Sequence, residues 1–395
     1  MPLDNISYIG NKTFWGIEYD WNKIRKLYKS LECPKVFYNP CKCPFENSMF
    51  FVLFSARSVG KSTNWLLFGM CMNWLYGTVI QYIRQNDEQI APKYSRTMFD
   101  PIIENKYIEK LTNNKWNSCI YEKRRWYYAK YDKLGMLVDK SKEPFCVVLN
   151  VRDFETTKSS YNAPTGDLII FDEFVNSRYY PDEFVSFMQL VKTIQRERRS
   201  VRIVMLSNNT DRESPYFSEL EIYEEVRGLP MGCSTEKTTI KGTNIYIEYI
   251  TASSEKKEML NKINSMYYGF QNKRISSITG EGWDFKPCQR LPKGDCEIIS
   301  NNLYIYHNNR YLRLDILKHP ELGTCMNIHW AKYTFDDSVI LTLQDRTDPR
   351  YLYALGGDRI EYLIRQMKYK NMIYYASDDV YAFFENYLKE CGKNY

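Results

Sequence analysis

The sequence predicts an α/β chain whose first domain is a P-loop NTPase built on a parallel sheet. Three observations predict this fold: the apolar run Met49–Phe54, the phosphate-loop pattern Ser55–Ser62 directly after it, and the helix-like stretch Asn64–Tyr76 that follows. A continuous apolar run of this length is typical of a strand buried on both faces. The next apolar run, Thr78–Arg84, completes a strand–loop–helix–strand unit, which predicts parallel strands joined by a right-handed crossover.

Further apolar runs extend this domain. Asp167–Phe171 is a short run that ends in two acids, and Val201–Leu206 is another buried strand. Between them, Asp182–Arg196 is predicted as a helix. The remaining predicted strands are Trp126–Tyr131 and Phe145–Val151, in an inserted hairpin region, and Thr243–Thr251, the last of the domain.

The pattern changes after residue 251. Ala252–Tyr268 is a charged helical stretch, which we interpret as a linker, and short Tyr-rich strands begin beyond about Cys288. The later predicted elements are the strands Asn302–His307, Tyr311–Ile316 and Ser338–Leu343 and the helix Val380–Cys391. The predicted domains are an N-terminal extension over 1–36, a P-loop ATPase domain over 37–251, a helical linker over 252–290 and a smaller α+β domain over 291–395.

Length and composition limit the possible classes of protein. A chain of 395 residues is too long for one ordinary core, and 44% apolar residues favour globular folding over disorder. The net charge of +6 permits a polyanion partner without requiring one. No run of 18 apolar residues exists, so no membrane partner is expected. The 11 scattered cysteines and the lack of a signal-like start predict a cytoplasmic protein.

The phosphate loop is the strongest motif. In G-x-x-x-x-G-K-[ST], backbone N–H groups surround a phosphate, while Lys61 would bridge the β- and γ-phosphates and Ser62 would bind Mg²⁺. Ser55 stands where the first glycine belongs, which a serine tolerates if its φ is not forced positive. A chance GKS in a turn is the alternative, but the flanking strand and helix favour the phosphate loop. The predicted ATP-binding residues are Ser55, Ala56, Arg57, Ser58, Val59, Gly60, Lys61, Ser62 and Thr63.

The acid pair after the strand Asp167–Phe171 is the second motif expected in an ATP-hydrolysing site, beside the phosphate loop. Asp172 would hold Mg²⁺ through water, and Glu173 would polarise the attacking water. A helix cap or a surface acid pair is the alternative interpretation. The glutamate directly after the aspartate indicates an enzyme that activates water, whereas a small-molecule kinase does not need it.

Two further features lie near the strand Val201–Leu206. Asn208 follows it and would orient the water or sense the γ-phosphate, although a simple Asn turn fits equally well. Before the strand, QRERRSVR contains four arginines, including Arg196 and Arg198. An arginine placed there is a candidate finger for the nucleotide of a neighbouring subunit, and a solvated charge run is the alternative.

These motifs together resemble the DNA-packaging ATPases of small tailed phages of the phi29 type. The chain has FYNP at Phe37–Pro40, SARSVGKS, IIFDEF and an Arg-rich turn before a strand that ends in Leu-Ser-Asn, and the resemblance extends over about Phe37–Phe217. It implies a homomeric ring, usually of five subunits, at the portal of an empty capsid, where ATP hydrolysis drives translocation of double-stranded DNA. It also implies action in the cytoplasm of an infected host cell, transiently on the procapsid, with a structural RNA as a further possible partner.

The resemblance also assigns roles to particular residues. Arg196 falls at the position of the family's trans-acting arginine, Arg198 is the next candidate, and Lys158 falls near a second basic residue thought to act across the interface. The C-terminal domain resembles a ribonuclease-H-type fold that has lost its catalytic acids, with an active nuclease as the alternative. Two other functions stay open from sequence: a P-loop kinase of small molecules or nucleotides, and a non-catalytic assembly protein with a degenerate P-loop. The acids of the C-terminal region are Asp315, Asp336, Asp337, Asp378 and Asp379.

Overall fold

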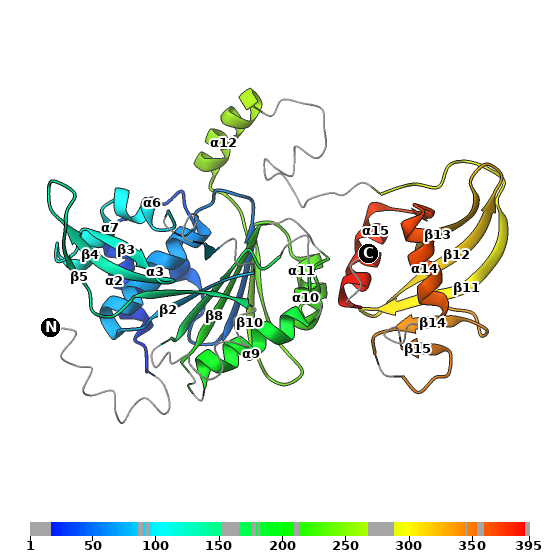
Figure 1. Cartoon of the computed structure of the whole chain (residues 1–395), viewed down its shortest axis with the longest axis horizontal. Helices are drawn as coiled ribbons and strands as arrows, with labels where there is room; N and C mark the ends of the chain where they lie inside the picture. The colour runs from blue at the N-terminus through cyan, green and yellow to red at the C-terminus, as the bar shows by residue number, and fades with distance from the viewer. Residues whose placement is uncertain are drawn as a thin grey trace. The chain divides into compact units, whose positions relative to one another are not determined.

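The computed structural model divides the chain into two compact units, shown in Figure 1. Unit 1 is drawn from Met1–Val175, Glu183–Thr210 and Glu224–Trp283, and unit 2 from Asn176–Asp182, Asp211–Tyr223 and Asp284–Tyr395. Unit 2 thus includes a segment that lies inside the predicted ATPase range 37–251. The structure describes residues 17–85, 90–91, 95, 97–151, 166–175, 179–180, 182–196, 198, 200–208, 213–267, 288–344, 346–353 and 359–391.

Unit 1 is built on a ten-stranded sheet with the order β3-β4-β6-β2-β7-β8-β1-β10-β9, and β5 pairs with β4. Six neighbouring strands, from β6 to β10 in this order, are parallel, as the sequence predicts. The central strands are β1 (Phe50–Ser55), β2 (Ile80–Arg84), β6 (Cys146–Asn150), β7 (Leu168–Asp172), β8 (Arg202–Asn208) and β10 (Asn244–Ile250). The outer strands are β3 (Ser118–Glu122), β4 (Arg125–Tyr131), β5 (Leu137–Lys140) and β9 (Ser234–Thr238).

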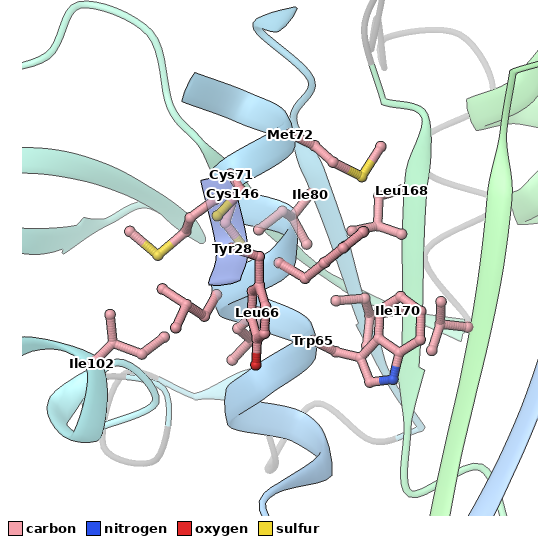
Figure 2. Close-up of a cluster of buried hydrophobic side chains, with 14 of the residues drawn as sticks. Tyr28, Trp65, Leu66, Cys71, Met72, Ile80, Ile102, Cys146, Leu168 and Ile170 are labelled. Atoms are coloured by element: carbon pink, nitrogen blue, oxygen red, sulfur yellow. The ribbon is translucent and has the colours of Figure 1, made fainter. Parts of the chain in front are cut away.

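Helices cover both faces of the central part of this sheet, which explains why strands such as β1, β6 and β7 are buried along their whole length. Along β7, Leu168 and Ile170 belong to the core around α3, whereas Phe171 packs against Phe187 of α9 with ring centroids 4.8 Å apart. Figure 2 shows Leu168 and Ile170 beside α3. Gly69 of α3 lies so close to β2 and β7 that a Cβ there would be 2.7 Å from Ile80. The helices are α2 (Trp21–Ser30), α3 (Lys61–Tyr76), α6 (Asp100–Glu104), α7 (Tyr107–Thr112), α9 (Glu183–Gln195), α11 (Tyr223–Gly228) and α12 (Ser254–Tyr267).

The segment that the sequence predicts as an N-terminal extension contributes buried side chains to unit 1. Asp20 caps α2, and Trp21 of this helix stacks on Phe45 with ring centroids 4.6 Å apart. The buried Tyr19 hydroxyl donates a hydrogen bond of 2.8 Å to Asp167, which directly precedes β7. These contacts make α2 part of the core rather than an appendage.

Unit 2 contains a six-stranded mixed sheet with the order β15-β14-β11-β12-β13-β16. Strands β11 to β13 form an antiparallel meander, and β14 pairs parallel to β11. This mixed sheet with helices agrees with the predicted α+β, ribonuclease-H-like domain. The strands are β11 (Glu297–His307), β12 (Arg310–His319), β13 (Gly323–Ala331), β14 (Val339–Thr342), β15 (Tyr351–Tyr353) and β16 (Ile373–Tyr375), and the helices are α10 (Pro215–Glu219), α14 (Arg359–Tyr369) and α15 (Asp378–Glu390).

Several elements differ from the sequence prediction. The elements that were not predicted are the strands β3, β5, β9, β13, β15 and β16 and the helices α6, α7, α10, α11 and α14. Strand β13 reads GTCMNIHWA, and its apolar and polar residues alternate from Met326 to Trp330, a strand signal that the sequence prediction did not use. Among the described residues, no helix combines the length and apolar composition needed to cross a membrane.

Candidate nucleotide site

The polar ends of four parallel strands meet at one edge of the unit 1 sheet. Ser55 at the end of β1 lies beside Asn208 at the end of β8, and Asp172 at the end of β7 lies beside Leu206. Because parallel strands all end at this carboxyl edge, side chains that are far apart in sequence gather there. They surround a cavity lined by Lys61, Ser62, Thr63, Leu66, Tyr82, Arg84, Met98, Asp172, Glu173, Ser207 and Asn208.

The phosphate loop connects β1 to α3 with a conformation that explains its sequence. Ser55 still belongs to β1, so its backbone is extended and a serine replaces the usual glycine without strain. Left-handed backbone occurs later, at Ser58 (φ 64°) and Gly60 (φ 78°). At Gly60 a Cβ would also lie 3.0 Å from Phe37 Cδ1 and Asn64 Nδ2, so only glycine fits.

The FYNP segment supports the loop from behind. The Tyr38 backbone N–H donates a hydrogen bond of 2.9 Å to the carbonyl of Val59, inside the loop. Asn64 of α3 donates to the Gly60 carbonyl at 2.8 Å and accepts a hydrogen bond from the buried Tyr28 hydroxyl at 2.6 Å. These contacts fix the loop on two sides, which gives FYNP a structural role that its sequence alone does not reveal.

Lys61 is the first residue of α3 and is only 7% exposed. Its ammonium donates hydrogen bonds to Ser55 Oγ and, at 3.4 Å, to Asn208 Oδ1. Burial lowers its pKa to about 8, although the carboxylates of Asp172 and Glu173 oppose this shift. Within the described part of the chain, no carboxylate lies at ion-pair distance from Lys61, so the site is suited to an added anion.

The two acids occupy different environments. Asp172 is buried; its Oδ2 accepts a hydrogen bond of 2.7 Å from the Tyr82 hydroxyl and lies 3.3 Å from Arg84 Nη2. Glu173 has a 46% exposed side chain, and its Oε2 lies 2.5 Å from Arg84 Nη1. The backbone of Glu173 is left-handed (φ 58°), an unusual conformation for a non-glycine residue that is often found at functional sites.

Tyr82 and Arg84 were missed by the sequence analysis. Arg84 is the last residue of β2, which was predicted as a strand, and Tyr82 lies two residues before it. The common edge of parallel strands was the signal that could have found them. Burial raises the pKa of the Tyr82 hydroxyl, so it stays protonated at neutral pH. Burial alone would lower the pKa of Arg84, but the Tyr82 hydroxyl and the carboxylates of Asp172 and Glu173 outweigh it and raise the value.

The predicted arginines lie at the opposite, amino edge of the sheet. Arg196 follows α9 and is exposed, with left-handed backbone (φ 51°). Arg198 is buried and pairs with Asp167 through an Nε–Oδ1 contact of 2.6 Å. Asp167 precedes Asp172 by five residues along β7, or about 16 Å of extended chain, so neither arginine reaches the cavity of its own chain. Lys158 lies outside the described residues.

Two acids of unit 2, Asp315 and Asp379, are held by separate partners of their own. Asp315 on β12 accepts hydrogen bonds from Arg313 Nε at 2.7 Å and from His329 Nε2 at 2.8 Å. Asp379 accepts one from the Trp330 indole at 2.8 Å. Among the residues that the structure describes, no group of three or more His, Cys, Asp or Glu is placed to hold a metal ion. That description covers Asp315, Asp336, Asp337, Asp378 and Asp379.

Comparison with known proteins relates this chain to viral DNA packaging proteins. Residues 33–228, which contain the phosphate loop, the acid pair and the Arg-rich turn, match the family of the podovirus DNA encapsidation protein (Gp16). This match covers 196 of the 395 residues, just under half of the chain. The DNA packaging proteins of Bacillus phages PZA and phi29 are each 25% identical to it over 195 residues, which is 48% of this chain and 52% of each relative.

The chain therefore spans about half the length of the curated relatives it matches. A structural likeness extends further. The Phi-28 gp11 DNA packaging motor has a TM-score of 0.55 and 15% identity, with 91% of this chain and 99% of that one covered. The packaging-protein fold thus includes most of unit 2 as well as unit 1.

Proposed function

We propose that this chain is an ATPase that drives double-stranded viral DNA into a preformed capsid. We further propose that it works as a homomeric ring, of five subunits as in the proteins it resembles, at the capsid portal, with a structural RNA as a further possible partner. The carboxyl-edge cavity carries this proposal, because it places the buried Lys61 beside Asp172 and Glu173. The encapsidation family supplies the link to DNA packaging.

The residues of the cavity fit a magnesium nucleotide. The helix α3 begins at Lys61, so its first N–H groups and the buried ammonium both favour phosphate at this point. The Ser62 hydroxyl and the Asp172 carboxylate are the oxygen ligands that Mg²⁺ prefers, directly or through water. When bound, Mg²⁺ would neutralise charge on the β- and γ-phosphates.

The protein residues then divide the work of hydrolysis. Lys61 binds the phosphates, and the Ser62 hydroxyl and Asp172 orient them with the metal ion. Glu173 extends into the cavity from a left-handed position and accepts a proton from the attacking water. Asn208 contacts Lys61 at 3.4 Å and is placed to orient this water or to contact the γ-phosphate.

Arg196 is proposed to complete the site of a neighbouring subunit. It is exposed at the amino edge, whereas the cavity of its own chain is at the carboxyl edge. Arg198 is held in a buried ion pair with Asp167 and anchors the same turn, so we favour Arg196 as the finger. A guanidinium presents a planar, permanently charged fork to the phosphoryl oxygens.

One assay tests the proposal. ATP hydrolysis by the purified protein is measured with and without double-stranded DNA, at equal protein concentration. The proposed motor hydrolyses ATP, and DNA changes its rate. Phosphorylation of a metabolite independent of DNA would select the kinase alternative, and absence of hydrolysis even with DNA would select the non-catalytic assembly protein.

A further inference from the structure

The Tyr82 hydroxyl links the two acids of the site. It donates a hydrogen bond of 2.7 Å to Asp172 Oδ2 and accepts one of 3.1 Å from Arg84 Nε. Arg84 in turn lies 2.5 Å from Glu173 and 3.3 Å from Asp172. A chain of contacts therefore runs from Asp172 through Tyr82 and Arg84 to Glu173.

Tyr82 suits this place because its ring is buried while its hydroxyl reaches the cavity. The residue is 3% exposed in strand β2, between the parallel neighbours β6 and β7, so its position is fixed by the sheet. A phenol hydroxyl has a single proton to donate. Asp172 receives it, which leaves the phenol oxygen free to accept from Arg84.

We propose that Tyr82 is a positioning residue that sets both acids at once, by fixing the Asp172 carboxylate for the metal ion and, through Arg84, the Glu173 carboxylate for water. This inference rests on the proposed ATPase function. Groups that hydrogen-bond a metal-binding carboxylate orient it and typically change metal affinity or activity 10- to 100-fold. The same hydroxyl accepts a hydrogen bond from one N–H group of Arg84. The Tyr82 hydroxyl therefore sets the direction in which Arg84 presents its other N–H groups to Glu173.

The test uses Tyr82→Phe, which removes one oxygen atom and keeps the buried ring. Tyr128→Phe is the matched control, because Tyr128 is also a buried tyrosine of this sheet and its hydroxyl has no hydrogen-bond partner in the described structure. Binding of Mn²⁺ in the presence of ADP is measured by electron paramagnetic resonance. We expect the Mn²⁺ affinity to fall by roughly 10- to 100-fold in Tyr82→Phe and to stay unchanged in Tyr128→Phe.

A second variant separates the effect of Tyr82 on Asp172 from its effect, through Arg84, on Glu173. Arg84→Lys keeps the positive charge but cannot contact Tyr82 and both acids from one planar group. It is expected to lose hydrolysis while it keeps more Mn²⁺ affinity than Tyr82→Phe, because the hydrogen bond from Tyr82 to Asp172 remains. Hydrolysis at the wild-type rate in Arg84→Lys would overturn the claim that Tyr82 positions Glu173 through Arg84.

The outcomes distinguish this inference from the function on which it rests. If the wild-type protein binds no Mn²⁺ with ADP and hydrolyses no ATP, the proposed function itself is wrong. If the wild type does both and Tyr82→Phe has the same Mn²⁺ affinity and hydrolysis rate, only the role of Tyr82 is wrong. Thermal unfolding of each variant checks that it is folded. If Tyr82→Phe does not fold, the hydrolysis rate and Mn²⁺ affinity of Arg84→Lys supply the test.

Discussion

The two units use aspartates in opposite ways, and their sheets also differ in topology. In unit 1 the strands next to the site are parallel, so Asp172, Asn208 and Arg84 all come from strand ends at one edge. In unit 2 the meander β11–β13 is antiparallel, so successive strands end at opposite edges. A parallel sheet therefore concentrates strand-end chemistry, whereas a meander disperses it.

The charged residues of the two units also differ in whether they have a partner of opposite charge. Lys61 is buried without a carboxylate at ion-pair distance in the described structure, so its site is suited to an anion from outside the chain. Asp315 already has Arg313 and His329 as partners, and this contact raises the pKa of His329 because the ring is stabilised in its protonated form. The first region is arranged to bind a ligand, and the second is satisfied within its own chain.

Lys61→Ala is expected to have the largest effect. It removes the buried cation that the phosphate loop itself contributes, so both ATP hydrolysis and DNA translocation should be abolished. Lys133→Ala, at an exposed turn of unit 1, is the control and should retain both. Hydrolysis at the wild-type rate in Lys61→Ala would remove the phosphate-loop interpretation entirely.

Arg196→Ala should bind ATP almost normally and lose roughly 10³- to 10⁵-fold in hydrolysis, the range for arginine fingers. The trans role is tested by mixing Arg196→Ala subunits with Glu173→Gln subunits, each nearly inactive alone. Some mixed interfaces then pair an intact Glu173 with an intact Arg196, and activity partly returns. Arg125→Ala, which changes an exposed arginine of strand β4, serves as the control.

If mixing restores nothing, Arg196 does not act on a neighbouring subunit, because every subunit then lacks one group that it needs from its own chain. Full activity of an isolated monomer contradicts the trans role as well. The same mixing should be repeated with Arg198→Ala. We expect that variant to lose stability rather than to complement, because it leaves the buried Asp167 without its cation.

A smaller effect concerns pH. The pKa of Lys61 in the protein without nucleotide is about 8, against an ordinary value of 10.5, so between these values the unfolded chain binds more protons than the folded one. The free energy of unfolding should therefore rise with pH across this window. Affinity for ADP should fall by up to about tenfold per pH unit above pH 8, because phosphate binds the ammonium form. Calorimetric titration checks this, and Lys61→Ala should show no such dependence.

The smallest effect is expected in unit 2. Asp315→Asn should leave DNA intact and change neither ATP binding nor hydrolysis, because Asp315 serves Arg313 and His329 rather than a metal pair. Linear DNA is incubated with Mn²⁺ and the wild-type protein or the variant. Degradation by the wild type that Asp315→Asn abolishes would show that unit 2 is a nuclease and would break the contrast between the two sheets.

Much of unit 1 could be predicted because its chemistry is local in sequence. The loop Ser55–Ser62 and the pair Asp172–Glu173 are contiguous, and each follows an apolar run that marks a buried strand. Asn208 was predicted for the same reason, since it follows another such run. Tyr82 and Arg84 were not, because no motif marks them and their role depends on β2 lying next to β7.

The rest depends on pairing that a single sequence does not contain. Nothing local distinguishes Arg196, which is exposed, from Arg198, which is buried by a salt bridge to a residue 31 positions earlier. Likewise, Asp315 is a candidate nuclease acid from sequence, and only the pairing of β12 with β13 brings it together with His329. The packing of Trp21 on Phe45 similarly turns a predicted extension into part of the core.

The most direct test of the central claim is Glu173→Gln, since the account assigns different tasks to two adjacent acids at one edge of the sheet. Binding of ATP with Mg²⁺ and the rate of hydrolysis are measured on the same preparation. We predict that binding is retained, because Lys61, Ser62 and Asp172 remain, and that hydrolysis is lost, because an amide cannot accept a proton from water. A variant that fails to bind nucleotide, or that hydrolyses ATP as fast as the wild type, would contradict the account.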